Sequence, residues 1–334
     1  MRTLGALGVW LLAVTGLAGC QDEFPLGSWG QPATAGQGGV APTSGGAGAG
    51  DAAGMATTAG TAGTAGGIAA LDSPSCGEVG VPGPLNASGA VGPNAGNIGT
   101  TSLYTDWSWP APVDSLEWDL VLEIDPENDG YYWAHQFSFV NGLTAFFGLQ
   151  AHGGFQLTTD GKVDFVKMAL FWVSSQRTAE LGDVQGEDAR VLVLTTRGVA
   201  WTTINAKFEW NPCTVYRLRV ARDGTAPSGD VWYGAWVEDR TTTVVTKIGR
   251  IGIPADWGQI SRLSTTLTTR IDDKPPPVTT CDQPEPASAI FGTPSGNDGQ
   301  LLPTPSNRFA SPLRCPSSRF TVLPEGVRHE IGVK

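Results

Sequence analysis

Acidic residues recur from Glu117 to Glu123, and paired carboxylates are the groups that hydrolysis of a glycosidic bond requires. Glu117, Asp119 and Glu123 alternate with apolar residues, so an extended strand would place them on one face. At about 3.3 Å per residue, Glu117 and Glu123 would lie roughly 20 Å apart. Catalytic pairs lie within about 10 Å of each other. We therefore favour a solvated strand face and assign no catalytic residue.

The stretch from Asp125 to Gly130 carries carboxylates at alternate positions before a glycine. Asp125, Glu127 and Asp129 offer oxygen ligands, which Ca²⁺ prefers. An EF-hand loop would carry Glu at its twelfth position, where this sequence has Gln136. Ca²⁺ is the only cofactor for which the sequence suggests ligands, and an ordinary acidic turn is the favoured alternative.

Aromatic and amide side chains between residues 131 and 150 indicate a ligand-binding patch. Aromatic rings present an apolar body, and the neighbouring polar groups can bond hydroxyls, a combination that suits a sugar. A buried core role is the alternative for each tryptophan. The candidate patch consists of Tyr131, Trp133, His135, Gln136 and Gln150.

Histidine is the usual general base in catalysis, and two histidines fall inside the strand-rich region. These are His135 and His152, and neither stands beside a serine or cysteine nucleophile motif. A structural or surface role is favoured for both.

The N-terminal residues resemble the leader of a bacterial lipoprotein. Leu4 to Leu17 is apolar and follows Arg2; it is shorter than the roughly 20 residues of a membrane span and fits an export signal. Leu17-Ala18-Gly19-Cys20 resembles the lipobox. The resemblance implies a signal peptide over residues 1–19 and acylation of Cys20. An ordinary signal peptide that contains a cysteine is the alternative.

Several acyl chains on one residue would anchor the chain stably to a membrane. In the lipoprotein family, Gln21 after the cysteine implies sorting to the outer membrane. We therefore expect an exported protein that is lipid-anchored to the cell envelope.

Residues 20–70 are expected to form a disordered Gly/Ala/Thr linker. From Gly27 to Ala70 nearly every residue is small, and such a segment cannot bury enough apolar surface to fold. About 50 residues of such coil reach roughly 40 Å. The linker would hold the remaining chain clear of a membrane.

The formal net charge of −11 makes nucleic acid an improbable partner, because the chain has no basic cluster. The expected partners are the membrane, through the lipid anchor, and a glycan.

Four cysteines follow Cys20, and an even number in an exported chain indicates two disulfides with three possible pairings. We favour Cys281–Cys315, which would close a proline-rich segment and contribute up to about 4 kcal/mol in the chain-entropy model. Cys76–Cys213 would then be the second bridge.

The folded region reads as strands and not helices. In Ser115–Ile124 and Val215–Val220 every second residue is apolar and most of the residues between are charged, and Asp160-Gly161 between two strand-like runs is a hairpin signal. Many strands at short spacing predict an all-β fold, an antiparallel β-sandwich of jelly-roll or concanavalin-like type. We expect the sandwich over residues 71–280 and a proline-rich extension packed on it over residues 281–334.

Parts of the region between Leu103 and Cys281 resemble a family of exported bacterial domains of unknown function. The resemblance rests on Gly130–Gln150, Phe171-Trp172, Tyr216–Val220 and Ile248–Gly258. It implies a lectin-like β-sandwich and brings no established reaction or catalytic residues.

These features lead to three functional hypotheses. The first is an envelope protein that displays a sandwich binding a polysaccharide or glycoconjugate. The second is a carbohydrate-active hydrolase whose carboxylates come from separate strands. The third is a structural or protein-binding component of the envelope.

Overall fold

The computed structural model describes residues 102–152, 156–157, 163–164, 167–196, 199–271, 284–311 and 318–333, which all belong to one compact unit. The predicted signal peptide, Cys20 and the linker lie outside these residues. So do Cys76, Cys281 and Cys315.

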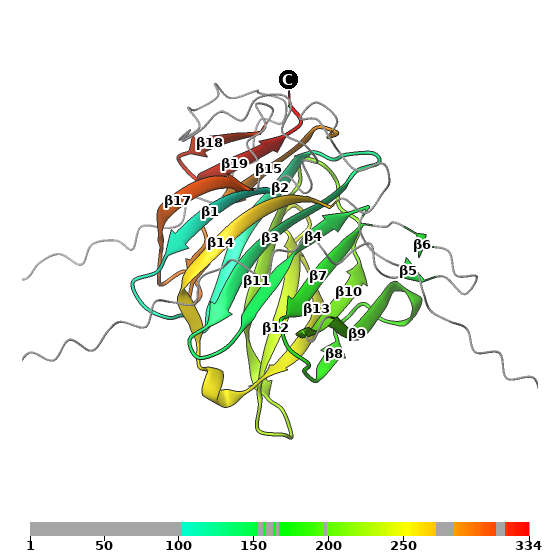
Figure 1. The fold of residues 1–334 in the computed structure, drawn as a ribbon, viewed down its shortest axis with the longest axis vertical. Helices are drawn as coiled ribbons and strands as arrows, with labels where there is room; N and C mark the ends of the chain where they lie inside the picture. Colours follow the sequence, from blue (N-terminus) through cyan, green and yellow to red (C-terminus); the bar gives the residue numbers. More distant parts are fainter. Residues whose placement is uncertain are drawn as a thin grey trace, which may run out of the picture. The chain divides into compact units, whose positions relative to one another are not determined.

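The described residues form an antiparallel β-sandwich, as the sequence predicts, and Figure 1 looks onto one of its two large sheets. This eight-stranded sheet contains, in spatial order, β17 (Thr304–Ser311), β1 (Ser102–Ser108), β14 (Ile260–Ile271), β3 (Gly130–Phe139), β4 (Thr144–Ala151), β7 (Met168–Val173), β10 (Val199–Lys207) and β9 (Ala189–Thr196).

The second large sheet has nine strands and lies behind the first in Figure 1. Its order is β18 (Arg319–Leu323), β19 (Gly326–Ile331), β15 (Ala287–Gly292), β2 (Ser115–Ile124), β11 (Val215–Thr225), β12 (Val231–Asp239), β13 (Val244–Ile253) and β8 (Ala179–Leu181), with β16 (Ser295–Gly296) also paired to β2.

Smaller elements complete the fold. A two-stranded hairpin pairs β5 (Gln156–Leu157) with β6 (Val163–Asp164), on either side of the Asp160-Gly161 signal. Two short 3₁₀ turns are η1 (Gly186–Asp188) and η2 (Ala255–Trp257). Among the described residues, no helix is long and apolar enough to cross a bilayer.

The alternation in β2 explains how the two sheets pack. Its apolar residues Leu116, Trp118, Leu120 and Leu122 are fully or almost fully buried between the sheets, while the intervening carboxylates point away from the core. Ile124 departs from the pattern, because it lies at the end of the strand and is 40% exposed.

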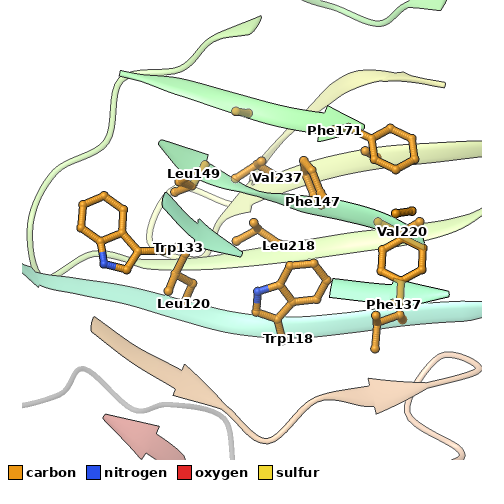
Figure 2. Close-up of a cluster of buried hydrophobic side chains, with 14 of the residues drawn as sticks. Trp118, Leu120, Trp133, Phe137, Phe147, Leu149, Phe171, Leu218, Val220 and Val237 are labelled. Carbon is orange, nitrogen blue, oxygen red and sulfur yellow. The ribbon is translucent and has the colours of Figure 1, made fainter. Parts of the chain in front are cut away.

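The core is rich in large aromatic side chains from both sheets. Figure 2 shows Trp118 of β2 and Phe147 of β4 in this cluster, with Trp133 at its left. The ring centroids of Trp118 and Phe147 are 5.9 Å apart in an edge-to-face arrangement, which aromatic pairs prefer. Burial of each such side chain contributes about 1.5–3 kcal/mol.

Residues 284–311 and 318–333 contribute strands to the sandwich itself, whereas the sequence predicted an extension packed on it. Strands β15, β19 and β18 extend the nine-stranded sheet beyond β2, and β17 adds an edge strand to the other sheet. The prolines in this segment conceal the strand pattern in the sequence.

Candidate ligand-binding face

The outward side of the eight-stranded sheet carries a second cluster of aromatic side chains, separate from the core between the sheets, and four of its five rings are less than 10% exposed. Because successive side chains of a strand point to opposite faces, the residues between the core positions project away from the nine-stranded sheet. Tyr132, between the core residues Tyr131 and Trp133, is one of them. We call this surface the aromatic face; its rings are Tyr104, Tyr132, Phe146, Trp172 and Trp201.

Strand register places the side chains of the aromatic face in rows that cross the sheet. One row spans six strands, which at about 4.8 Å per strand is roughly 24 Å. It consists of Asp106, Thr265, Gln136, Phe146, Trp172 and Thr203.

Two further rows run parallel to the first. The middle row has its smallest residues at the centre, and it consists of Tyr104, Leu267, Ala134, Gly148, Leu170 and Asn205. A side chain at Gly148 would meet the backbone oxygen of Trp133 at 2.1 Å, so only glycine fits there. The third row consists of Ser102, Thr269, Tyr132, Gln150, Met168 and Lys207.

The rings of the aromatic face hold each other in place. Phe146 and Trp172 stack with centroids 4.3 Å apart and planes 9° apart. The hydroxyl of Tyr132 donates to the backbone oxygen of Leu170 at 3.2 Å, and burial raises its pKa well above the usual value. The ring of Trp201 packs beside them and is half-buried. These contacts hold the rings in fixed positions.

Polar side chains lie around and between these rings. The Asp106 carboxylate accepts a hydrogen bond from the Thr265 hydroxyl at 2.7 Å, and the Thr203 hydroxyl donates to the Asn205 amide oxygen at 2.7 Å. Gln136 is partly exposed beside Phe146. Gln150 is 6% exposed beside Tyr132. The arrangement combines apolar rings with hydrogen-bonding groups on one rigid surface.

The predicted patch of five residues divides between the two sides of the sheet. Gln136 and Gln150 lie on the aromatic face. Tyr131, Trp133 and His135 are fully buried between the sheets, which corrects the expectation that they line an accessible surface. Strand alternation separates the two groups, because His135 and Gln136 are adjacent and must point in opposite directions.

His135 lies in an apolar environment that keeps its imidazole neutral. Its ring is 4.9 Å from that of Trp118, and neither ring nitrogen has a hydrogen-bond partner among the described residues. Burial lowers the pKa of His135 to about 3. Because the side chain is enclosed, it cannot reach a ligand on the surface. His152, the other predicted histidine, follows β4 with a positive φ of 49° and is partly exposed.

The carboxylates of the acidic turn from Asp125 to Gly130 bond to lysine, arginine and backbone N–H groups of the protein itself. Asp125 forms a salt bridge with Lys167, and Asp129 receives two hydrogen bonds of 2.9 Å from Arg270. Glu127 is exposed. No group of three potential metal ligands occurs among the described residues, which include all three carboxylates.

Asp129 and Glu285 together connect this turn to the C-terminal strands. Glu285 accepts hydrogen bonds from the backbone and side-chain nitrogens of Asn128 at 2.8 and 2.7 Å, and its own backbone N–H donates to Asp129 at 2.9 Å. Partial burial raises the pKa of Glu285, but the hydrogen bonds from Asn128 and Asp129 outweigh it and leave the pKa lowered. The turn therefore has a structural role.

The carboxylates of β2 lie together on the outer face of the nine-stranded sheet, and each is bound by a neighbour. Asp119 forms a bidentate pair with Arg217 at 2.8 and 3.2 Å. Glu123 forms one with Arg328 at 2.7 and 2.8 Å, and both side chains are less than 10% exposed. This corrects the expected solvated face, and we call it the ion-paired face.

Of the four cysteines expected to pair, Cys213 lies among the described residues. It is disulfide-bonded, with its partner outside them, so the predicted pairings stay predictions. Its backbone N–H donates to the oxygen of Leu122 at 2.8 Å, which ties this turn to β2.

Comparisons of the chain with models of protein families and with curated proteins found no match. The candidate site therefore rests on geometry.

Sequence reasoning missed most of the aromatic face. Tyr104, Tyr132, Phe146 and Trp172 were not among the predicted residues. Strand alternation was the available signal. Tyr132 and Gln136 are four positions apart on one strand and therefore lie on the same face, whereas Trp133 lies on the other.

Proposed function

We propose that the protein is a lipid-anchored envelope component whose sandwich binds a polysaccharide or glycoconjugate on the aromatic face. The observation that carries this proposal is the set of rigid rings with amides and hydroxyls between them. Sugar rings have apolar C–H surfaces that pack on aromatic side chains and hydroxyls that bond amides. Preorganised rings reduce the entropy lost on binding.

Binding has more support than hydrolysis because of how the carboxylates are placed. On the described strands of the aromatic face, Asp106 is the one carboxylate, and it already accepts a hydrogen bond from Thr265. The carboxylates of β2 lie on the opposite side of the sandwich, where Asp119 and Glu123 are paired with arginines and Glu117 accepts a hydrogen bond from the Ser295 hydroxyl. A hydrolase would need two carboxylates within about 10 Å on either side of a ligand.

A glycan panel tests the proposal. The full chain, solubilised in a mild detergent, is applied to immobilised polysaccharides, and both retained protein and released sugar are measured. We expect retention without release. Release of sugar would favour the hydrolase, and the absence of retention on every glycan would favour a protein partner and overturn the proposal.

The lipid anchor is tested separately. Growth with a labelled fatty acid should label the protein, and Cys20→Ser should abolish the label. Persistence of the label in Cys20→Ser would contradict acylation at this residue.

A further inference from the structure

We propose that strand β9 pairs with its counterpart in a second copy of the chain, so that two sandwiches share one continuous sheet. The proposal does not depend on a glycan ligand or on the lipid anchor, because it rests on the edges of the two large sheets.

Three of the four sheet edges carry features that oppose pairing with another chain. Strand β17 contains Pro305, which has no N–H to donate. Strand β8 has three residues, and the side chain of Glu180 at its centre is bound by Arg250. Strand β18 has five residues and begins with Arg319. Short strands, charges and proline are the usual means by which proteins keep sheet edges from joining.

Strand β9 is the fourth edge, and it lacks these features over most of its length. It has eight residues, contains no proline and carries one charge, Arg190, beside its first residue. In the described part of the chain it pairs with β10 alone, and it lies at the margin of the sheet in Figure 1. Its other side therefore presents backbone N–H and C=O groups, which are a template for a further strand.

The side chains of β9 present apolar surface to solvent at this edge. Val191 and Val193 lie on the same side of the strand, and Val191 packs against the core. Val193 is 45% exposed, and Thr195 on the same side is exposed as well. Pairing of two copies would remove both Val193 side chains from water, which favours association.

The sequence of β9 is compatible with pairing to itself. In an antiparallel pair centred on Val193, the two Val193 residues stand opposite each other and Val191 stands opposite Thr195. Opposed positions are the same or an even number of residues apart, so each side chain keeps to its own side of the joined sheet. Arg190 stands opposite Thr196, so no like charges face each other. A two-fold axis relates the copies, and the arrangement closes as a dimer.

Sedimentation equilibrium of the full chain tests the proposal. In a mild detergent matched in density to the solvent, the protein mass should rise with concentration from one chain to two. Val193→Lys places a charge at the centre of the edge and should weaken dimerisation at least tenfold. Val322→Lys, at a 60% exposed position on the β18 edge, is the matched control and should leave the dimer unchanged. A single-chain mass at every concentration, or equal effects of the two variants, would overturn the proposal.

Cysteine cross-linking provides a second test that does not depend on the stability of Val193→Lys. Residues directly opposite each other in an antiparallel pair have Cα atoms about 4.5–5.5 Å apart, a separation that a disulfide can span. Val193→Cys should therefore form a disulfide-linked dimer under mild oxidation, whereas Val322→Cys should not. Failure of Val193→Cys to link, or equal linkage of the two variants, would contradict pairing through β9.

Discussion

The two outer faces of the sandwich are built from strands of the same kind, and they present opposite chemistry. The ion-paired face satisfies its charges internally, as Asp119 does with Arg217 and Glu123 with Arg328. The central strands of the aromatic face carry rings and amides, and Gln136 and Gln150 have no hydrogen-bonded partner among the described residues.

The difference indicates which side can bind a ligand. A bidentate arginine–carboxylate pair uses the strongest hydrogen-bonding groups of both partners, so they are already committed. Cation–π contacts engage the tryptophans of the same side: Arg219 and Lys247 lie over Trp236 and Arg250 over Trp232. On the aromatic face Gln136 is partly exposed and Gln150 is 6% exposed, and neither amide is hydrogen-bonded to another described residue. The side with fewer charges is therefore the better candidate for recognition.

The largest loss of stability is expected from breaking a buried ion pair on the ion-paired face. Arg328→Leu leaves the carboxylate of Glu123 largely buried without its cation, and loss of one partner of a buried pair costs about 3–5 kcal/mol. Urea denaturation should show this loss in the free energy of unfolding. Arg240→Ala is the control, because its pair with Glu238 is more exposed and should contribute less than about 1 kcal/mol.

The double variant Glu123→Leu with Arg328→Leu sharpens the test. It removes both charges together and should recover most of the lost stability. A double variant as unstable as Arg328→Leu would mean that the arginine acts by packing and not by charge.

The next largest effect is the pH dependence of stability, which comes from two histidines buried inside the sandwich. Burial lowers the pKa of His135 to about 3, and burial with the nearby charge of Arg308 does the same for His329. The unfolded chain takes up these protons near pH 6.5 and the folded chain does not. The free energy of unfolding therefore keeps its full value above pH 6.5. Below that pH it falls by about 1.4 kcal/mol per pH unit for each histidine.

Denaturation between pH 6.5 and 5 measures this slope above the main titration of the carboxylates. His135→Phe should reduce the slope by about half, since one of the two buried histidines is removed. An unchanged slope in His135→Phe would contradict the burial of a neutral imidazole.

The smallest effect on stability is expected for the amides of the aromatic face. Gln136→Ala removes a partly exposed side chain that bonds no described residue, so the free energy of unfolding should change by less than about 0.5 kcal/mol. Affinity for the retained glycan should fall at least tenfold in a binding titration. A large loss of stability with unchanged affinity would assign Gln136 to the fold and not to recognition.

Strand alternation allowed the sandwich to be predicted from the sequence. Alternation in β2 and β11 is clear because one face of each strand is apolar and the other charged. The orientation of β3 was not predictable in the same way, because Tyr131 and Trp133 on one side and Tyr132 on the other are all aromatic. On the first side, Trp118 of the nine-stranded sheet packs against His135, and Trp210, which lies between β10 and β11, packs against Trp133.

The ion pairs were beyond sequence reasoning for another reason. Glu123 and Arg328 are 205 positions apart, and they meet because β15 pairs with β2 on one side and with β19 on the other. The spacing of carboxylates within β2 predicted their common face but carried no information about their partners.

Two tryptophans at half-buried positions test the central claim most directly. Trp201 lies on the aromatic face and Trp236 on the ion-paired face. The affinity of the full chain for its retained glycan is measured for Trp201→Ala and Trp236→Ala, with folding checked by thermal denaturation. We predict at least a tenfold loss for Trp201→Ala and less than a twofold change for Trp236→Ala. The opposite order would place recognition on the ion-paired face and contradict the assignment.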